Sequence, residues 1–342
     1  MKSLQPSDYV EPYLDDAIRG ERRPAIRLTL DLLDNGVPED RVVTDLLAAA
    51  QCEVGERWYR NEFTVVDEHV VTGVSAAALA ALAGESTPPA STGHTVVSCA
   101  EGDWHSLAAQ MFGETLRSHG VGVTVLGAST PADLVAKSLS HRGADSLAVS
   151  CSVPIFFAGV ARLVNAAHRE GFPVIVGGRA MGGDSRRAER LGADAWASTA
   201  AEAAVILDHW RSHPPAISHN PTPLHPVAVR LAADAWALGH SALDGLAARF
   251  PPLADYDERQ RARTSEDLVF IVQFLAAAIL VADDVVFTEF LVWLQILLIN
   301  RSVPRRALIT GLEELRPAIA AVDASAARLL DTGRQQLVNA LG

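Results

Sequence analysis

Apolar residues in the first part of the chain recur at helical spacing. Ile26, Leu30 and Leu33 fall on one face of a helix, and the run from Val42 to Leu47 forms another such face. Pro38-Glu39-Asp40 before that run is a typical helix start. The pattern predicts a four-helix bundle over residues 1–84.

From residue 94 to 210 the pattern changes to short β-branched runs separated by segments of helix length. Five runs are predicted to be strands: Val96–Cys99, Val121–Leu126, Leu147–Cys151, Val174–Val176 and Ala193–Ala197. Alternating strands and helices are typical of a parallel sheet that is covered on both faces. We therefore expect a flavodoxin-like, doubly wound α/β domain with a five-stranded parallel sheet.

The last part, residues 224–342, has no strand pattern and predicts an all-α domain of four or five long helices. One apolar helix is expected to open at Thr264-Ser265-Glu266-Asp267 and to run to Val281, and a second to open at Phe287 and to end near Asn300. Both are apolar almost all round, as core helices are. Linkers rich in proline and small polar residues, 85–93 and 211–223, separate this multidomain chain into its three parts.

Composition narrows the classes of function. The chain has 342 residues, of which 49% are hydrophobic and 20% charged, and a net charge of −12, which argues against nucleic acid as a partner. The apolar stretch Leu268–Ile299 is interrupted by acidic residues, so no membrane span is expected. Cysteines without paired spacing and a polar N-terminus without a signal peptide predict a cytoplasmic protein.

Three predicted strand ends carry chemically informative residues. Asp103 and His105 follow the first strand, Ser150 closes the third, and Gly177-Gly178 closes the fourth. Open α/β sheets bind their ligands at the carboxyl ends of the strands. A carboxylate two residues from a histidine can take one ring N–H, which leaves the other nitrogen free to bind a metal.

These residues resemble the cobalamin-binding domain, whose pattern is D-x-H-x-x-G, then S-x-L, then G-G. The resemblance implies that His105 is the lower axial cobalt ligand and that Asp103 orients it. It also implies that cobalamin and its nucleotide tail contact Trp104, Ser150, Ser152, Gly177 and Gly178. Two positions depart from the pattern, since Ala108 replaces the first glycine and Ser152 the leucine.

In the predicted bundle, Trp58 is followed by nine residues and then by Glu68-His69. This W-x9-EH spacing resembles the bundle of CarH-type cobalamin photoreceptors. The resemblance implies that Trp58, Glu68 and His69 lie over the upper face of adenosylcobalamin, whose cobalt–carbon bond is broken by light. Tyr59 stands where those photoreceptors carry a second cobalt-ligating histidine. His69 or water would therefore have to take the upper position.

CarH-type regulators begin with a winged-helix DNA-binding domain, for which there is no room before the predicted bundle. We therefore expect no direct contact with DNA. The output is expected to pass through a homo-oligomer or a separate output protein.

The C-terminal part resembles sensor globins that lack haem. All eleven histidines lie at or before His240, so the two long apolar helices offer no proximal haem ligand. A linear bilin needs arginines for its propionates and aromatic walls for its flat body. The candidates for bilin binding are Tyr256, Arg259, Arg263, Trp293, Arg301 and Arg305. No cysteine follows Cys151, so the bilin would be bound non-covalently.

Together the three parts resemble the photocobilins, which join a cobalamin photoreceptor module to a biliverdin-binding globin-like domain. The resemblance implies a light sensor with adenosylcobalamin and biliverdin as cofactors, and not an enzyme. Two alternatives stay open. One is a corrinoid methyl carrier of a methyltransferase system, and the other is a cobalamin-dependent adaptor without a bilin.

Overall fold

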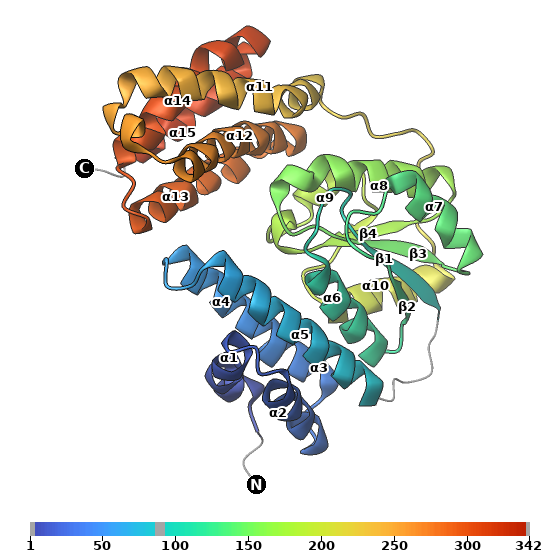
Figure 1. Cartoon of the computed structure of the whole chain (residues 1–342). Coiled ribbons are helices and arrows are strands. Elements are labelled where there is room, and N and C mark those ends of the chain that lie inside the picture. Colours follow the sequence, from blue (N-terminus) through green and yellow to red (C-terminus); the bar gives the residue numbers. More distant parts are fainter. Residues whose placement is uncertain (1–3, 86–92, 340–342) are drawn as a thin grey trace. The chain divides into compact units, whose positions relative to one another are not determined.

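The computed structural model describes residues 4–85 and 93–339 (Figure 1). The chain divides into two compact units. The first contains the N-terminal helices and the sheet. The second contains the helices after Pro221 together with the short segments Val153–Ala161 and Glu189–Gly192. Each unit is described by itself.

The N-terminal helices form the expected bundle. Its elements are η1 (Pro6–Tyr9), α1 (Val10–Ile18), α2 (Arg22–Asp34), α3 (Glu39–Val42), η2 (Val43–Ala48), α4 (Ala49–Tyr59) and α5 (Val65–Glu85). α3, η2 and α4 follow one another without a break, because the residues at both junctions keep right-handed helical dihedrals. η2 is a π-helical segment of six residues. The result is four helices around one core, as the apolar spacing predicts.

The second predicted domain contains a parallel sheet of five strands: β1 (His94–Cys99), β2 (Gly122–Val125), β3 (Ser146–Ser150), β4 (Val174–Gly177) and β5 (Ala195–Trp196). The strand order is β2-β1-β3-β4-β5, which is the flavodoxin-like order. The sheet therefore confirms the predicted fold class. The order reverses between β1 and β3, and this is the place where such sheets bind their ligands.

Helices connect and cover the strands (Figure 1). They are α6 (Ser106–Ser118), α7 (Ala132–His141), η3 (Pro154–Phe156), α8 (Phe157–Arg169), η4 (Arg179–Met181), α9 (Arg186–Arg190) and α10 (Ala200–Ser212). On α6, Leu107 and Met111 are buried in the same apolar cluster as the bundle core. The bundle is thus packed against the helix that begins directly after His105.

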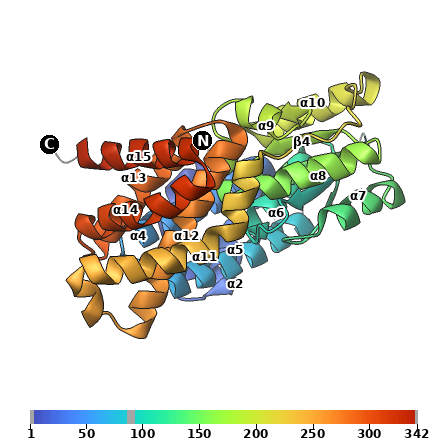
Figure 2. The same cartoon turned by 90° about the horizontal axis from the view of Figure 1, so that it is seen from above.

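The second unit contains α11 (Pro226–Arg249), η5 (Pro251–Asp255), α12 (Glu258–Val281), α13 (Val285–Asn300), α14 (Arg305–Val322) and α15 (Ala324–Asn339), in agreement with the all-α expectation (Figures 1 and 2). α11 lies along α12, and Gly239 allows this close approach. A Cβ atom at Gly239 would lie 2.7 Å from Cγ2 of Val269. Such a contact would force the two helices apart.

Both predicted starts of the apolar helices are wrong. α12 begins at Glu258 and not at Thr264, because Asp257 and Gln260 form a capping box that fixes an earlier start. α13 begins at Val285 and not at Phe287, and the backbone N–H of Val285 donates to Asp283. The first turn of α12 is polar, so the apolar period alone locates its start too late.

Two helices, α5 and α12, are long and apolar enough to cross a membrane by length and composition alone. In α12, 56% of the most apolar window is buried inside the protein. Core helices of ordinary globular domains pass the same test.

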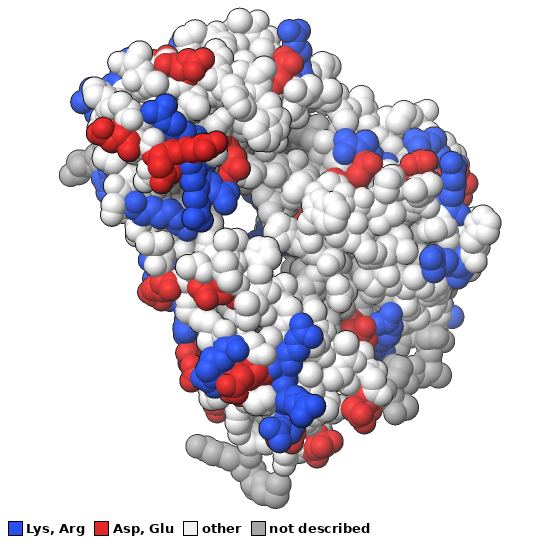
Figure 3. Space-filling view, viewed as in Figure 1, with Lys and Arg blue, Asp and Glu red and all other residues white. Residues whose placement is uncertain are grey.

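On the face that Figure 3 shows, Lys and Arg side chains lie interspersed with Asp and Glu side chains.

Candidate functional site

Asp103 and His105 form a closely bonded pair in the loop between β1 and α6. Oδ1 of Asp103 lies 2.6 Å from Nδ1 of His105 and also accepts the backbone N–H of His105 at 2.9 Å. Oδ2 of Asp103 accepts the backbone N–H of Ser152 at 2.8 Å. The Asp103 side chain is 1% exposed, whereas that of His105 is 59% exposed. The carboxylate is therefore fixed inside the protein and the ring reaches out of it.

The pKa values show which state this pair favours. Burial by itself would raise the pKa of Asp103, but the hydrogen bonds from His105 and Ser152 outweigh it and lower the pKa. The hydrogen bond to Asp103 raises the pKa of His105, against the effect of burial, and the charges of Asp103 and Glu68 add to the increase. An ionised carboxylate can only accept, so in the neutral His105 ring Nδ1 carries the hydrogen and Nε2 has a free lone pair. This is the arrangement of a histidine that binds a metal through Nε2.

His105 does not share its place with other metal ligands. In residues 4–85 and 93–339, no group of three or more His, Cys, Asp or Glu residues is positioned to hold a metal ion. A metal bound by the protein alone needs several such ligands. A metal that arrives inside a macrocycle needs only an axial ligand from the protein. A single histidine with a free ring nitrogen, such as His105, can serve as an axial ligand of this kind.

A narrow cavity of about 180 Å³ opens beside the strand ends. Ser150, Gly177 and Gly178 line it, together with Ala108 of α6 and Thr199 before α10. The two glycines keep it open. A Cβ at Gly177 would lie 3.0 Å from the carbonyl oxygen of Ala197, and one at Gly178 would lie 2.5 Å from that of Cys151. Gly178 also has a φ of 101°, which side chains rarely allow. The slot is thus lined largely by glycines and small side chains.

The structure changes the interpretation of two polar positions near the slot. Ser152 is not among the residues that line it, and its backbone N–H instead holds Asp103. Ser198 and Thr199 line the slot although the sequence analysis passed over them. They directly follow β5, so the rule that ligands bind at strand ends could have found them. Trp104 is 75% exposed beside His105.

In the bundle, a chain of hydrogen bonds links Glu68 to the core. The Thr72 hydroxyl lies 2.9 Å from Oε1 of Glu68 and 3.0 Å from Oε1 of Gln51. Nε2 of Gln51 donates to the Ser75 hydroxyl at 2.9 Å, and the Tyr13 hydroxyl donates to the same oxygen at 3.0 Å. Burial raises the pKa of Tyr13 to about 12, although its hydrogen bond to Ser75 lowers it. We call these five residues the polar chain.

The residues of the W-x9-EH motif lie on either side of the turn between α4 and α5. Trp58 is half-buried in the last turn of α4, and Glu68 is in the first turn of α5. The His69 side chain is 73% exposed and lies 3.0 Å from Oε2 of Glu68. Because the charge of Glu68 contributes to the raised pKa of His105, these two side chains interact electrostatically.

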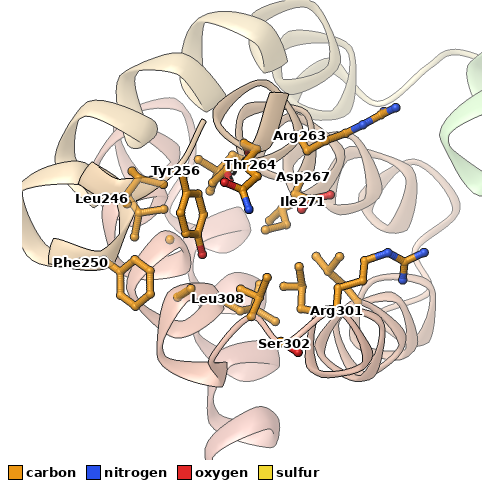
Figure 4. A pocket seen from close by; sticks show the side chains of 18 of the residues that line it. Leu246, Phe250, Tyr256, Arg263, Thr264, Asp267, Ile271, Arg301, Ser302 and Leu308 are labelled. Atoms are coloured by element: carbon orange, nitrogen blue, oxygen red, sulfur yellow. Dashed lines mark hydrogen bonds between the residues drawn. The ribbon is translucent and has the colours of Figure 1, made fainter. Parts of the chain in front are cut away.

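In the second unit, a cavity of about 580 Å³ opens between α11, η5, α12, α13 and α14 (Figure 4). Four of the six predicted bilin residues line it, namely Tyr256, Arg259, Arg263 and Arg301. Arg305 and Trp293 do not line the cavity. Trp293 lies instead beside the Phe290 ring, with a centroid separation of 6.1 Å. Leu246, Phe250, Asp267, Leu268 and Ile271 line it as well, and the sequence analysis did not identify them as site residues.

Comparison with known proteins assigns the first unit. Residues 93–206 match a family model described as a B12 binding domain, and residues 9–83 match a second model with the same description. This part of the chain is a B12-binding module. The expectation of a cobalamin-type cofactor is thereby confirmed.

Two known proteins are similar to this module. The HTH-type transcriptional repressor CarH of Myxococcus xanthus is 31% identical over 173 residues, which make up 49% of this chain and 57% of the repressor. The chain therefore spans little more than half the length of that relative. The structure of the Methanosarcina barkeri monomethylamine corrinoid protein is 20% identical, with a TM-score of 0.51, and it covers 59% of this chain and 98% of its own. At this identity the match shows the fold alone.

Proposed function

We propose that this protein is a light sensor that binds adenosylcobalamin in the first unit and a bilin in the second. The Asp103–His105 pair carries the cobalamin half, because a buried, ionised carboxylate holds the tautomer that leaves Nε2 free for cobalt. The glycine-lined slot beside it has the shape and the small side chains that a nucleotide tail needs. When bound, adenosylcobalamin supplies a cobalt–carbon bond that visible light breaks.

Residues of the helical bundle respond to the loss of the adenosyl group. Trp58 and Glu68 are proposed to contact the adenosyl group, with His69 or water as the upper ligand once the group has left. Glu68 can rotate only if its hydrogen bond to Thr72 breaks. Since Thr72 leads through Gln51 and Ser75 to the buried Tyr13, such a rotation disturbs the bundle core. We propose that the signal leaves through this rearrangement of domains, within a homo-oligomer or towards a separate output protein.

The bilin half rests on the cavity in the second unit. The cavity is large enough for a drug-sized ligand. Apolar side chains line much of it, and Arg259, Arg263 and Arg301 line it as well. Figure 4 places Arg263 and Arg301 on one side of the cavity, away from Phe250 and Tyr256. Guanidinium groups bind carboxylates such as propionates with charge-assisted hydrogen bonds. We propose that biliverdin binds here non-covalently in a globin-like domain.

The visible spectrum of the full-length protein tests both halves. The protein is purified in the dark and loaded with adenosylcobalamin and biliverdin. Corrinoid bands that change on green illumination and a separate red band are the expected result. Corrinoid bands that do not respond to light would favour a methyl carrier. A light response without uptake of biliverdin would favour an adaptor without a bilin.

A denaturing gel tests how the bilin is held. After denaturation in acid, no pigment should remain on the polypeptide, since no cysteine lies in the second unit. A pigment that stays attached would contradict non-covalent binding.

A further inference from the structure

One carboxyl group in the cavity of the second unit has no evident structural use. Asp267 lies on the α12 wall of the cavity, next to Ile271 (Figure 4). Within the described residues, its side chain neither forms a hydrogen bond nor lies within ion-pair distance of a cation. By contrast, the neighbouring Glu266 forms an ion pair with Arg263 at 2.6 Å. Asp267 is therefore a half-buried carboxyl group to which no group in residues 4–85 and 93–339 donates a hydrogen bond.

The charged groups around Asp267 do not restore its ordinary pKa. Burial raises its pKa to about 7, and the charge of Glu266 adds to the increase, whereas Arg301 and Arg263 lower it only in part. Burial also lowers the pKa of Arg301, against the effect of Asp267. Tyr256 and Arg259 line the same cavity. A carboxyl group in this position costs stability in the empty protein.

Arginines and apolar side chains also line the cavity. Arg259 has no hydrogen-bonding or ionic partner within the described residues, and Arg263 lies one turn further along the same helix towards Asp267. Phe250, Leu268 and Ile271 supply apolar walls. The cavity thus combines cations for the acidic groups of a ligand with a carboxyl group, that of Asp267, that accepts no hydrogen bond within the described residues.

We propose that Asp267 accepts hydrogen bonds from the pyrrole N–H groups of the bound bilin, while the arginines hold its propionates. This inference rests on the proposed bilin site and deepens it, because it names the side chain that binds the pyrrole N–H groups at the centre of the pigment. A flat ligand with inward N–H donors and two outer carboxylates can pair with Asp267 and with the arginines of the cavity at once. A fatty acid offers no N–H donor and would leave Asp267 unpaired.

The test uses the full-length protein and titrates it with biliverdin in the dark. Asp267→Asn should weaken binding by about 10- to 100-fold, the size of a lost charge-assisted hydrogen bond. It should also shift the red absorption band, because the acceptor at the pyrroles changes. Asp267→Glu should recover part of the affinity. Glu258→Gln is the matched control: it removes an exposed carboxylate from the same helix, outside the cavity, and should bind as the wild type does.

The outcomes separate this inference from the proposed function. If the wild type binds biliverdin and Asp267→Asn binds it equally well with the same spectrum, the inference is wrong and the bilin site stands. If the wild type takes up no biliverdin, the proposed bilin half fails first. Thermal unfolding of the pigment-free proteins adds a second readout. Asp267→Asn should melt at the same temperature as the wild type or higher, and a clear decrease would show a structural role and overturn the inference.

Discussion

Asp103 and Asp267 are both carboxyl groups at candidate binding sites, but their surroundings act on them in opposite ways. Asp103 is buried and accepts three hydrogen bonds, two of them from His105, and its pKa is lowered. Asp267 lines the cavity of the second unit, accepts no hydrogen bond within the described part of the chain, and has a pKa raised to about 7. Burial acts on both in the same direction. The donors decide the difference.

The comparison separates two uses of a carboxyl group. The Asp103 carboxylate already accepts its hydrogen bonds before any ligand binds, so its task is to orient His105. Asp267 is incomplete, and its hydrogen-bonding capacity is available to a ligand. A satisfied buried charge indicates a positioning residue, whereas an unsatisfied one beside a cavity indicates a binding residue. Four experiments test this contrast, beginning with the largest expected effect.

Replacement of His105 by Ala removes the group that Asp103 positions. We expect cobalamin retention to fall by more than about 100-fold, since loss of an orienting partner alone costs 10–100-fold. The corrinoid spectrum should shift towards the base-off form. Equilibrium dialysis and absorption spectroscopy measure the two effects. Retention with an unchanged spectrum would show that another residue ligates the cobalt.

Asp103→Asn keeps the size of the side chain but removes its charge. We expect cobalamin binding to weaken by about 10–100-fold, because the amide no longer fixes the tautomer of His105. The same dialysis assay measures it. If Asp103→Asn and His105→Ala lose the same affinity, Asp103 has a role beyond orienting His105.

The stability of the ligand-free protein should depend on pH through Asp267. Its pKa is about 7 in the folded state and about 3.9 in an unfolded chain. As the pH rises from about 4 to 7, the unfolded chain has already lost this proton while the folded state still holds it. The folded state therefore becomes less favourable over this window, by on the order of 1–3 kcal/mol. Asp103, with its lowered pKa, stabilises the fold at neutral pH and loses this effect only in acid.

Urea unfolding between pH 4 and pH 8 measures the difference. The gain in unfolding free energy of Asp267→Asn over the wild type should grow up to about pH 7 and then stay constant. A gain that does not change with pH would contradict the raised pKa. Asp103→Asn is the control, and it should show a loss of stability at neutral pH.

Trp58→Ala tests the proposed contact between Trp58 and the adenosyl group. An indole that covers the adenosyl group should contribute about tenfold in affinity for adenosylcobalamin. Methylcobalamin lacks the bulky group, so its binding should change little. Spectroscopic titration with both forms measures the ratio. Equal losses would assign Trp58 to the bundle core.

The cobalamin site could be predicted further than the cavity of the second unit, and the reason is physical. Asp103, His105, Ser150, Gly177 and Gly178 all follow strands, and the parallel order of a sheet brings strand ends together without knowledge of the loops. The sequence therefore placed these residues correctly near one edge. It does not point to Thr199, because the D-x-H, S and G-G pattern has no residue after the fifth strand, although that strand itself is predicted.

The cavity has no comparable rule. Its wall comes from α11, η5, α12, α13 and α14, and which residues face it depends on the phase and crossing of each helix. Trp293 and Arg305 lie in the right helices but do not line it. Asp267 was taken as part of a helix start, because a capping box further upstream was not recognised. A carboxyl group without a donor can be found only once its neighbours are known.

The π-helical segment η2 has a consequence for insertions and deletions. One π turn amounts to one extra residue in a helix, which rotates all that follows by about 100°. Gln51 of the polar chain and Trp58 both follow η2 in the same helix. Loss of one residue between Val43 and Ala48 would leave the helix continuous, yet it would turn Gln51 away from Ser75 and Trp58 away from its place beside the α4–α5 turn. The length of this stretch is thus constrained by residues up to three turns further along.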